Sequence, residues 1–263
     1  MSTSWFDPVI FSLGPLQVRW YGLMYVIGFV IGGQLLKIMC KEGYSKISVE
    51  KIDSFITYLI IGMFIGARLT YVFVYNWEYY SQNLNELLAV WKGGLSFHGA
   101  LIGMVAALVL FARKNKLKFF EVSDILAVGV GPGLFFGRIG NFINGELWGR
   151  ASNVPWAMVF PDAGPYPRHP SQLYEAVLEG LVLFLVLWFS HKRFRFYGIA
   201  SGAFLLMYGT FRFVIEFFRE PDSQLGFFFG GLTMGQILCF LMIMAGALFI
   251  RAALKKKIVI TCH

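Results

Sequence analysis

Long apolar runs separated by short polar segments dominate the pattern of this chain. A helix needs about 20 mostly apolar residues to cross the hydrocarbon core of a bilayer. Seven runs approach that length, and each predicts a transmembrane helix. They cover residues 18–39, 54–76, 95–112, 122–143, 172–190, 197–217 and 226–250. The pattern therefore predicts an all-α, polytopic membrane protein with seven transmembrane helices, forming a single domain over residues 1–263.

Most of the Lys and Arg residues fall in the segments that follow the first, third, fifth and seventh runs. These are Lys37, Lys41, Lys46, Lys51, Arg113, Lys114, Lys116, Lys118, Lys192, Arg193, Arg195, Arg251, Lys255, Lys256 and Lys257. The other ends of the runs hold Arg19, Arg68, Lys92, Arg138, Arg150, Arg168, Arg212 and Arg219. Because basic loops stay in the cytoplasm, we expect the N-terminus outside and the C-terminus in the cytoplasm.

Composition agrees with this picture, since 57% of the residues are hydrophobic and only 14% are charged. The net charge of +8 does not indicate nucleic-acid binding, because topology and anionic lipid headgroups account for its distribution. Cys40, Cys239 and Cys262 are scattered and predict neither a disulfide framework nor a metal site. The N-terminal sequence MSTSWFDP has no basic segment before the first run, so no cleavable signal peptide is expected.

Three outer segments, residues 1–17, 77–94 and 144–171, are expected to lie along the membrane surface as loops or arms. All three are rich in aromatic residues, which favour the membrane–water interface. The segment 144–171 also contains five prolines, which stiffen a chain that is too short for an independent domain.

Polar residues that are costly in lipid gather in the outer halves of the runs, and an ionisable group there is a functional candidate. They are Arg68, His98, Arg138, Asn141, Glu175, Glu179, Tyr208, Arg212, Glu216 and Arg219. Each alone has a structural interpretation: a snorkelling arginine, an Arg212–Glu216 pair, satisfied buried acids at Glu175 and Glu179, or an interfacial histidine. Together they favour a basic pocket for a phospholipid headgroup, because the planar guanidinium matches phosphate.

Five long motifs carry a resemblance to a known family. They are GRIGNFINGELWGR (137–150), RWYGLMY (19–25), GGLSFHGALIG (93–103), RHPSQLYEA (168–176) and RFVIEFFREPD (212–222). On these motifs the chain resembles the bacterial prolipoprotein diacylglyceryl transferases, and the resemblance extends over about residues 8–250. It implies transfer of the diacylglyceryl group from phosphatidylglycerol to the lipobox cysteine of precursor lipoproteins, forming a thioether and releasing glycerol phosphate. It also implies a seven-helix bundle in the bacterial plasma (inner) membrane with its site facing outward.

The resemblance and the chemistry together suggest roles for the candidate residues. Arg138 and Arg212 are expected to bind the phosphate, and Tyr21 and Asn141 to orient the headgroup or the precursor. His98 is the candidate base, with His169 as a second choice, because the thiolate is the nucleophile. The remaining candidates are Glu146, which is expected to pair with an arginine, and a supporting shell of Arg68, Gly149, Arg150, Glu216 and Arg219. No cofactor and no metal are expected.

Other functions remain open from the residues alone. An outward-facing anion or lipid transporter would also use outer arginines, although a through-path needs polar residues along its whole length. A rhomboid-like protease would need a serine beside a histidine, but Ser96 and His98 point apart on a helix. A seven-helix receptor fits the topology and leaves the arginines unexplained. Only the transferase would produce a lipid-modified peptide from phosphatidylglycerol.

Overall fold

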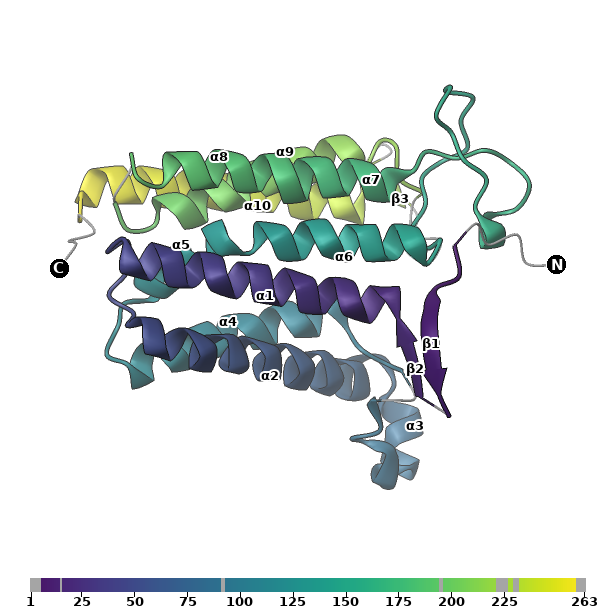
Figure 1. Ribbon diagram of the computed structural model, residues 1–263, viewed down its shortest axis with the longest axis horizontal. Helices are drawn as coiled ribbons and strands as arrows, with labels where there is room; N and C mark the ends of the chain where they lie inside the picture. The colour runs from purple at the N-terminus through teal and green to yellow at the C-terminus, as the bar shows by residue number, and fades with distance from the viewer. Residues whose placement is uncertain are drawn as a thin grey trace.

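The computed structural model of the chain describes residues 6–14, 16–90, 93–193, 196–220, 227–228 and 232–258. Its long helices run side by side along one axis, and the two termini lie at opposite ends of the bundle (Figure 1). Lys92, Arg195 and Cys262, which enter the sequence argument, lie outside the described residues.

Helices account for most of the described residues. They are α1 (Trp20–Lys41), α2 (Ile52–Thr70), α3 (Trp77–Gln82), α4 (Phe97–Lys114), α5 (Phe119–Gly129), α6 (Gly131–Ile143), α7 (Ser171–Glu175), α8 (Leu183–Ser190), α9 (Ile199–Ile215) and α10 (Met234–Lys256). The turn η1 (Val49–Lys51) and the π-helical turn η2 (Tyr71–Tyr75) flank α2, and a second π-helical segment, η6 (Ala176–Val182), joins α7 to α8.

Five of these continuous helical segments are long and apolar enough to span a membrane. They are Trp20–Lys41, Val49–Tyr75, Phe97–Lys114, Ser171–Ser190 and Met234–Lys256. The bent pair α5–α6 makes a sixth if it is counted as one span, and α9 is apolar but shorter. The prediction of an all-α polytopic membrane protein is therefore confirmed, while the count of seven transmembrane helices stays a prediction.

Two of the predicted runs differ from the observed helices. The run 122–143 is not one straight helix, because α5 and α6 meet at an angle of 45°. Pro132 lies in the first turn of α6, where a missing N–H is tolerated and a new helix can begin. Within the described part of the last run the helix begins at Met234, where Thr233 and Gln236 form a reciprocal capping box.

Glycines bring α2 and α4 into close contact. A Cβ atom added at Gly62 would lie 2.6 Å from the carbonyl oxygen of Gly103, and Gly66 faces Gly99 in the same way. Small residues allow such approach in lipid, where the hydrophobic effect does not drive helices together.

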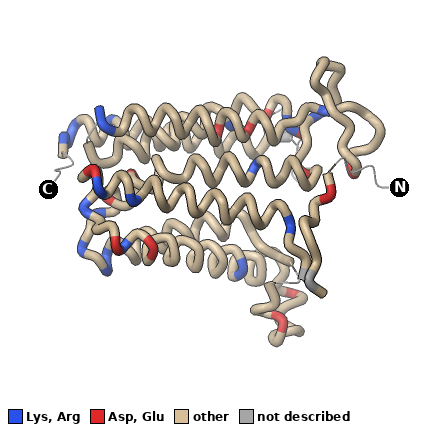
Figure 2. Tube along the Cα trace, viewed as in Figure 1, with Lys and Arg blue, Asp and Glu red and all other residues tan. Residues whose placement is uncertain are grey.

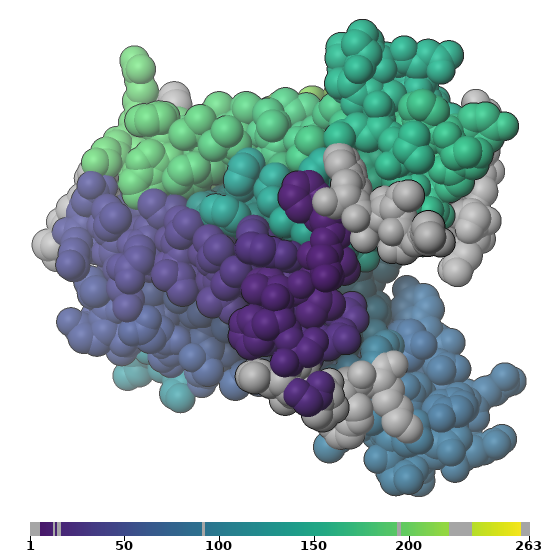
Figure 3. All heavy atoms as spheres, turned by 45° about the vertical axis from the view of Figure 1, so that its right-hand side comes forward, coloured from purple at the N-terminus to yellow at the C-terminus, as the bar shows by residue number. Residues whose placement is uncertain are grey.

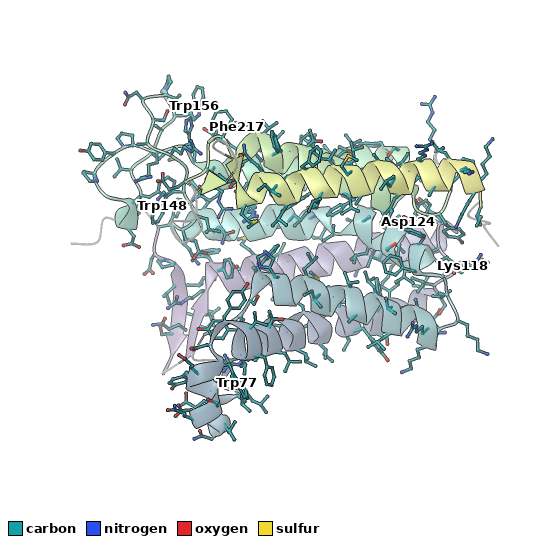
Figure 4. All side chains as sticks on the ribbon, turned by 180° about the vertical axis from the view of Figure 1, so that it is seen from behind. Trp77, Lys118, Asp124, Trp148, Trp156 and Phe217 are labelled. Carbon is teal, nitrogen blue, oxygen red and sulfur yellow. The ribbon has the colours of Figure 1, made fainter. Side chains whose placement is uncertain are left out.

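Apolar side chains cover the outside of the bundle as well as its core. Large side chains such as Val30, Ile61, Phe189 and Phe240 are exposed along the helices. Continuous exposed apolar surface of this kind needs a bilayer to cover it. Lys and Arg residues gather at the end of the bundle that holds the C-terminus (Figure 2), and Lys118 lies there, far from Trp148 and Trp156 (Figure 4).

The opposite end of the bundle carries the three predicted outer segments. An antiparallel hairpin, β1 (Val9–Leu13) and β2 (Leu16–Arg19), leads into α1. The segment with α3 and the long loop between α6 and α7 project from the same end (Figures 1 and 3). A second short hairpin, β3 (Phe227–Phe228) and β4 (Leu232–Thr233), precedes α10. The sequence argument predicted surface elements here but neither hairpin.

Candidate active site

Arg138 and Arg212 come from different helices and meet at one carboxylate. Arg138 lies on α6, and its Nε is 2.6 Å from Glu175 Oε2. Arg212 lies near the end of α9, and its Nη1 donates to Glu175 Oε1 at 2.8 Å. Glu175, at the end of α7, is 1% exposed. The convergence of these two arginines agrees with the sequence argument, whereas the bridging role of Glu175 was missed.

Two further carboxyl groups complete what we call the acid–base cluster: Arg138, Glu175, Glu179, Arg212 and Glu216. Glu179 lies 3.7 Å from Arg138 Nη2 and 3.8 Å from Arg212 Nη1. Glu216 Oε2 lies 3.3 Å from Arg212 Nη2, as the spacing of four residues predicts. Ionisable groups in a membrane protein usually face the bundle interior and lie close to one another, and this cluster follows that rule.

The π-helical segment η6 positions Glu179 in the cluster. Such wide turns are rare and occur frequently at functional sites. Directly after Glu179, Gly180 allows the backbone of α6 to approach, because a Cβ atom there would lie 2.6 Å from Phe135 Cα. Tyr208 on α9 faces Glu179, Arg138 and Arg212 from the third side. The sequence argument placed Tyr208 on this face of α9 without giving it a role.

The signature segment forms a tight turn directly after α6. Asn141 Nδ2 donates to Glu146 Oε1 at 2.8 Å, and Asn144 Nδ2 is 3.4 Å from the same oxygen. Leu147 adopts a left-handed conformation (φ +58°), and Gln172 Nε2 donates to the carbonyl oxygen of Glu146. Within the described residues Glu146 Oε1 meets these two amide groups and no Glu146–arginine pair is found, so that expected pair stays a prediction.

Tyr21 belongs to the same region. It lies in the first turn of α1 and contacts α6 at Gly140, where an added Cβ atom would be 3.0 Å from Tyr21 Cδ2. Its hydroxyl is 3.1 Å from the hydroxyl of Tyr25, and it interacts with Asn141 and Glu146. The structure thus brings together Tyr21 and Asn141, the two residues expected to orient a ligand, and places Glu146 beside them.

Gly149 and Arg150 fasten the long loop to the end of α9. The backbone N–H of Gly149 donates to the carbonyl oxygen of His169, and that of Arg150 to the carbonyl oxygen of Phe218, both at 2.9 Å. Arg150 Nε also donates to the carbonyl oxygen of Arg219 at 2.9 Å. Gly149 therefore contributes backbone contacts, and Arg150 ties the loop to the backbone of Phe218 and Arg219.

Arg68 is not part of the acid–base cluster. It is 4% exposed, and its guanidinium donates to the carbonyl oxygens of Glu86, Leu87, Gly93 and Gly94 at 2.8–3.0 Å. Tyr80 lies against it, 5.0 Å from ring centroid to Cζ. Arg68 therefore lies apart from Arg138 and Arg212. Its guanidinium group holds the backbone carbonyl groups of the loop that follows α3 against α2.

The two candidate bases occupy different surroundings. His98 is exposed in the first turn of α4, and within the described residues it makes a ring contact with Phe97 and no hydrogen bond. His169 Nδ1 is 3.0 Å from the hydroxyl of Tyr174, and burial lowers the pKa of His169. The described residues contain no group of three or more His, Cys, Asp or Glu side chains suited to a metal ion.

Comparison with known proteins decides the family. Residues 8–252 match the family model for prolipoprotein diacylglyceryl transferase. This chain belongs to the prolipoprotein diacylglyceryl transferase family. It is 53% identical over 246 residues to the phosphatidylglycerol–prolipoprotein diacylglyceryl transferase of Nitratidesulfovibrio vulgaris (strain DP4), covering 93% of this chain and 94% of that protein.

Other relatives agree in name and extent. The proteins of the same name from Oleidesulfovibrio alaskensis and Mannheimia succiniciproducens are each 51% identical, and each match covers 96% of this chain. These alignments cover 95% and 94% of the two proteins. The resemblance drawn from the five motifs is thereby confirmed. With the apolar helices, membership of this transferase family indicates a multi-pass protein of the bacterial inner membrane.

Proposed function

We propose that this chain transfers the diacylglyceryl group of phosphatidylglycerol to the thiol of a lipobox cysteine in a precursor lipoprotein. In this reaction sulfur attacks the glycerol carbon that bears the phosphate. A C–S bond forms, the C–O bond breaks, and glycerol phosphate leaves with the electron pair. The main observation in support is the meeting of Arg138 and Arg212, from two helices, at the buried Glu175. The names of the relatives agree with this reaction.

The proposed orientation has seven crossings, with the N-terminus outside and the C-terminus in the cytoplasm. Seven helical segments and the concentration of Lys and Arg at the C-terminal end support it (Figure 2). The acid–base cluster then faces the periplasm or cell exterior. Residues 1–17, 77–94 and 144–171 form surface arms of a single domain in this proposal.

Arg138 and Arg212 are assigned to the phosphate. Within the described residues, the ion pairs use Nε and Nη2 of Arg138 and the two Nη atoms of Arg212. Nη1 of Arg138 and Nε of Arg212 remain available for phosphate oxygens. Fixed guanidinium donors stabilise the charge that develops on a leaving phosphate without reorganising during the reaction.

The residues around this pair receive positioning roles. Tyr21, Asn141 and Glu146 orient the lipid headgroup or the incoming cysteine, because they form one polar group beside α6. Gly149, Arg150, Glu216 and Arg219 hold the long loop and the end of α9 against the site. Arg68 holds the segment 86–94 in place.

His98 is proposed to accept the proton of the thiol. Its ring is exposed and forms no hydrogen bond with the described residues, so both nitrogens are accessible. An imidazole has a pKa close to neutral and suits this task, whereas an arginine stays protonated.

The phosphate role is tested with Arg138→Lys and Arg212→Lys, each assayed with phosphatidylglycerol and a lipobox peptide. Loss of a fixed donor to developing charge lowers kcat by about 10²–10³-fold. Arg251→Lys is the matched control, because Arg251 is exposed near the far end of α10. Near-normal turnover in both site variants would contradict the phosphate assignment.

The base is tested with His98→Asn between about pH 6 and about pH 9. We expect a lower rate near neutrality that recovers as the free thiol ionises at high pH. An unchanged rate throughout would remove His98 from the proton transfer.

The orientation is tested by labelling single cysteines with an impermeant maleimide in spheroplasts. A cysteine at Ser152 should react and one at Asn115 should not, and the reverse pattern would overturn the orientation. The transporter alternative lacks a specific observation in its favour, and the family does not support it.

A further inference from the structure

The acid–base cluster contains more carboxyl groups than guanidinium groups. Arg138 and Arg212 face Glu175, Glu179 and Glu216, so full ionisation would leave one negative charge unbalanced. A bound phosphodiester would add another. An unpaired buried charge is strongly unfavourable at low dielectric constant. Neutralising one of the three carboxyl groups would remove one of these two unbalanced charges, so binding of an anion favours a neutral carboxyl group in the cluster.

Two of the three carboxylates have partners that stabilise the charged form. The carboxylate of Glu175 forms ion pairs with Arg138 Nε at 2.6 Å and with Arg212 Nη1 at 2.8 Å. Glu216 forms an ion pair with Arg212 Nη2 at 3.3 Å and accepts a hydrogen bond from the hydroxyl group of Thr233 at 3.0 Å. Glu216 also lies at the N-terminus of α10, because a Cβ atom added to Gly235 would be 2.8 Å from Glu216 Oε1. A helix N-terminus favours a negative charge, so neither residue is the neutral one.

Glu179 has the surroundings of a neutral carboxyl group. Its side chain is 0% exposed, no well-formed hydrogen bond reaches either oxygen within the described residues, and the hydroxyl group of Tyr208 faces it. The closest guanidinium nitrogens are 3.7 Å and 3.8 Å away, beyond hydrogen-bond distance. The other titratable groups that face it are Glu175 on α7 and Tyr208 on α9, and α8 contributes none.

We infer that Glu179 carries a proton in the state that binds phosphatidylglycerol, and that this proton limits the unbalanced charge of the occupied site to the single negative charge of the phosphodiester. The inference rests on the proposed function. With Glu179 neutral, two arginines balance Glu175 and Glu216, and the lipid adds a single negative charge. Glu179 acts here as a positioning residue, since it sets the net charge of the acid–base cluster and need not touch the lipid.

The protonation state is tested by infrared difference spectroscopy on the full chain in detergent. The wild-type protein should show the carbonyl stretch of a protonated carboxyl group, shifted by deuteration and lost at high pH. Glu179→Gln should remove this band, whereas the matched control Glu216→Gln should retain it. Absence of the band in the wild-type protein would overturn the inference without reference to any variant, as would its persistence in Glu179→Gln.

The functional consequence is tested by binding phosphatidylglycerol in nanodiscs, without peptide, across a pH series. Above the pH at which the band is lost, wild-type affinity should fall by about tenfold per pH unit, because binding then requires uptake of one proton. In Glu179→Gln this dependence should disappear, and the same slope in both proteins would refute the proposal. If the wild-type protein shows this pH dependence of binding but modifies no lipobox peptide, the transferase function is disproved. The protonation of Glu179 would still be supported in that case.

Discussion

Replacing Gly149 by alanine tests whether the long loop must touch the end of α9. The added Cβ atom would lie 2.5 Å from the carbonyl oxygen of Phe218 and 2.7 Å from both Cβ and the carbonyl oxygen of His169. Favourable contacts between such atoms lie near 3.5–4.0 Å, so the two segments must separate by about 1 Å. Two of the three atoms belong to backbone, and a rotamer change therefore cannot relieve the contact.

This separation stretches the hydrogen bonds from Gly149 N–H to His169 and from Arg150 N–H to Phe218. Each is worth about 0.5–1.5 kcal/mol, so the loop loses about 1–3 kcal/mol of local stability. The effect on turnover should be larger. Gly149 follows Glu146 by three residues, and Phe218 follows Arg212 by six. A displacement of about 1 Å in such groups lowers rates by about 10²-fold.

The assay is transfer from phosphatidylglycerol to a lipobox peptide, with thermal unfolding measured on the same preparation. We expect Gly149→Ala to lose about 10²-fold in kcat with a small change in melting temperature. Gly133→Ala in α6 is the control, because a Cβ atom there meets nothing within 4 Å. A Gly149→Ala protein with wild-type kcat would refute the argument, and so would an equal loss in Gly133→Ala.

Three further changes test other parts of the structure. Arg68→Gln removes the donors that hold the segment 86–94, so limited proteolysis should cut there while the helices stay intact; unchanged protection would contradict this role. Asp124 accepts the backbone N–H groups of Gly198 and Ser201 at the start of α9, and Asp124→Ala should destabilise the chain by at least about 1–2 kcal/mol, seen as a lower melting temperature. Burial lowers the pKa of His169 in the folded protein. The contribution of this side chain to the free energy of unfolding is therefore present above the unfolded pKa of about 6.5 and is lost as the pH falls through the lower folded pKa. This pH dependence of stability should be absent in His169→Gln.

The helices were predictable because lipid imposes a simple requirement. In the hydrocarbon region every backbone N–H and C=O group needs a partner within the protein. A long apolar run satisfies this requirement by forming a helix. Each of the seven runs accordingly coincides with a helical segment. The bend before Gly131 was missed, although Pro132 was a visible signal, because hydropathy does not register a change of direction.

The hairpin before α1 was missed for a different reason. Its strands span five and four residues, turn at Gly14 with φ +59°, and lie where lipid does not constrain the backbone. Short strands at an interface are stabilised by contacts with the rest of the protein. Those contacts are not visible in a hydropathy pattern.

Part of the candidate site was predictable from the energetic cost of placing polar groups in lipid. Arg138 and Arg212 were among ten residues that stood out because a polar group in the outer half of a membrane helix needs a partner, and the family resemblance then singled out these two. The identity of that partner was not predictable, because Glu175 lies 37 positions both before Arg212 and after Arg138. Only the packing of α6, α7 and α9 brings the three together. The same limit explains Arg68, whose acceptors are carbonyl groups that no side-chain pattern records.

The acid–base cluster argues for chemistry more strongly than for stability. A buried ion pair gains little over a well-packed apolar replacement, while removing one partner costs about 3–5 kcal/mol. A bundle that needed only to hold together would do as well with leucines at these positions. Five ionisable side chains at the meeting point of α6, α7, η6 and α9 are instead arranged so that Glu175 orients both guanidinium groups. The carboxylates hold both arginines, whose side chains stay partly exposed, and in the proposed function these side chains meet the phosphate of the lipid.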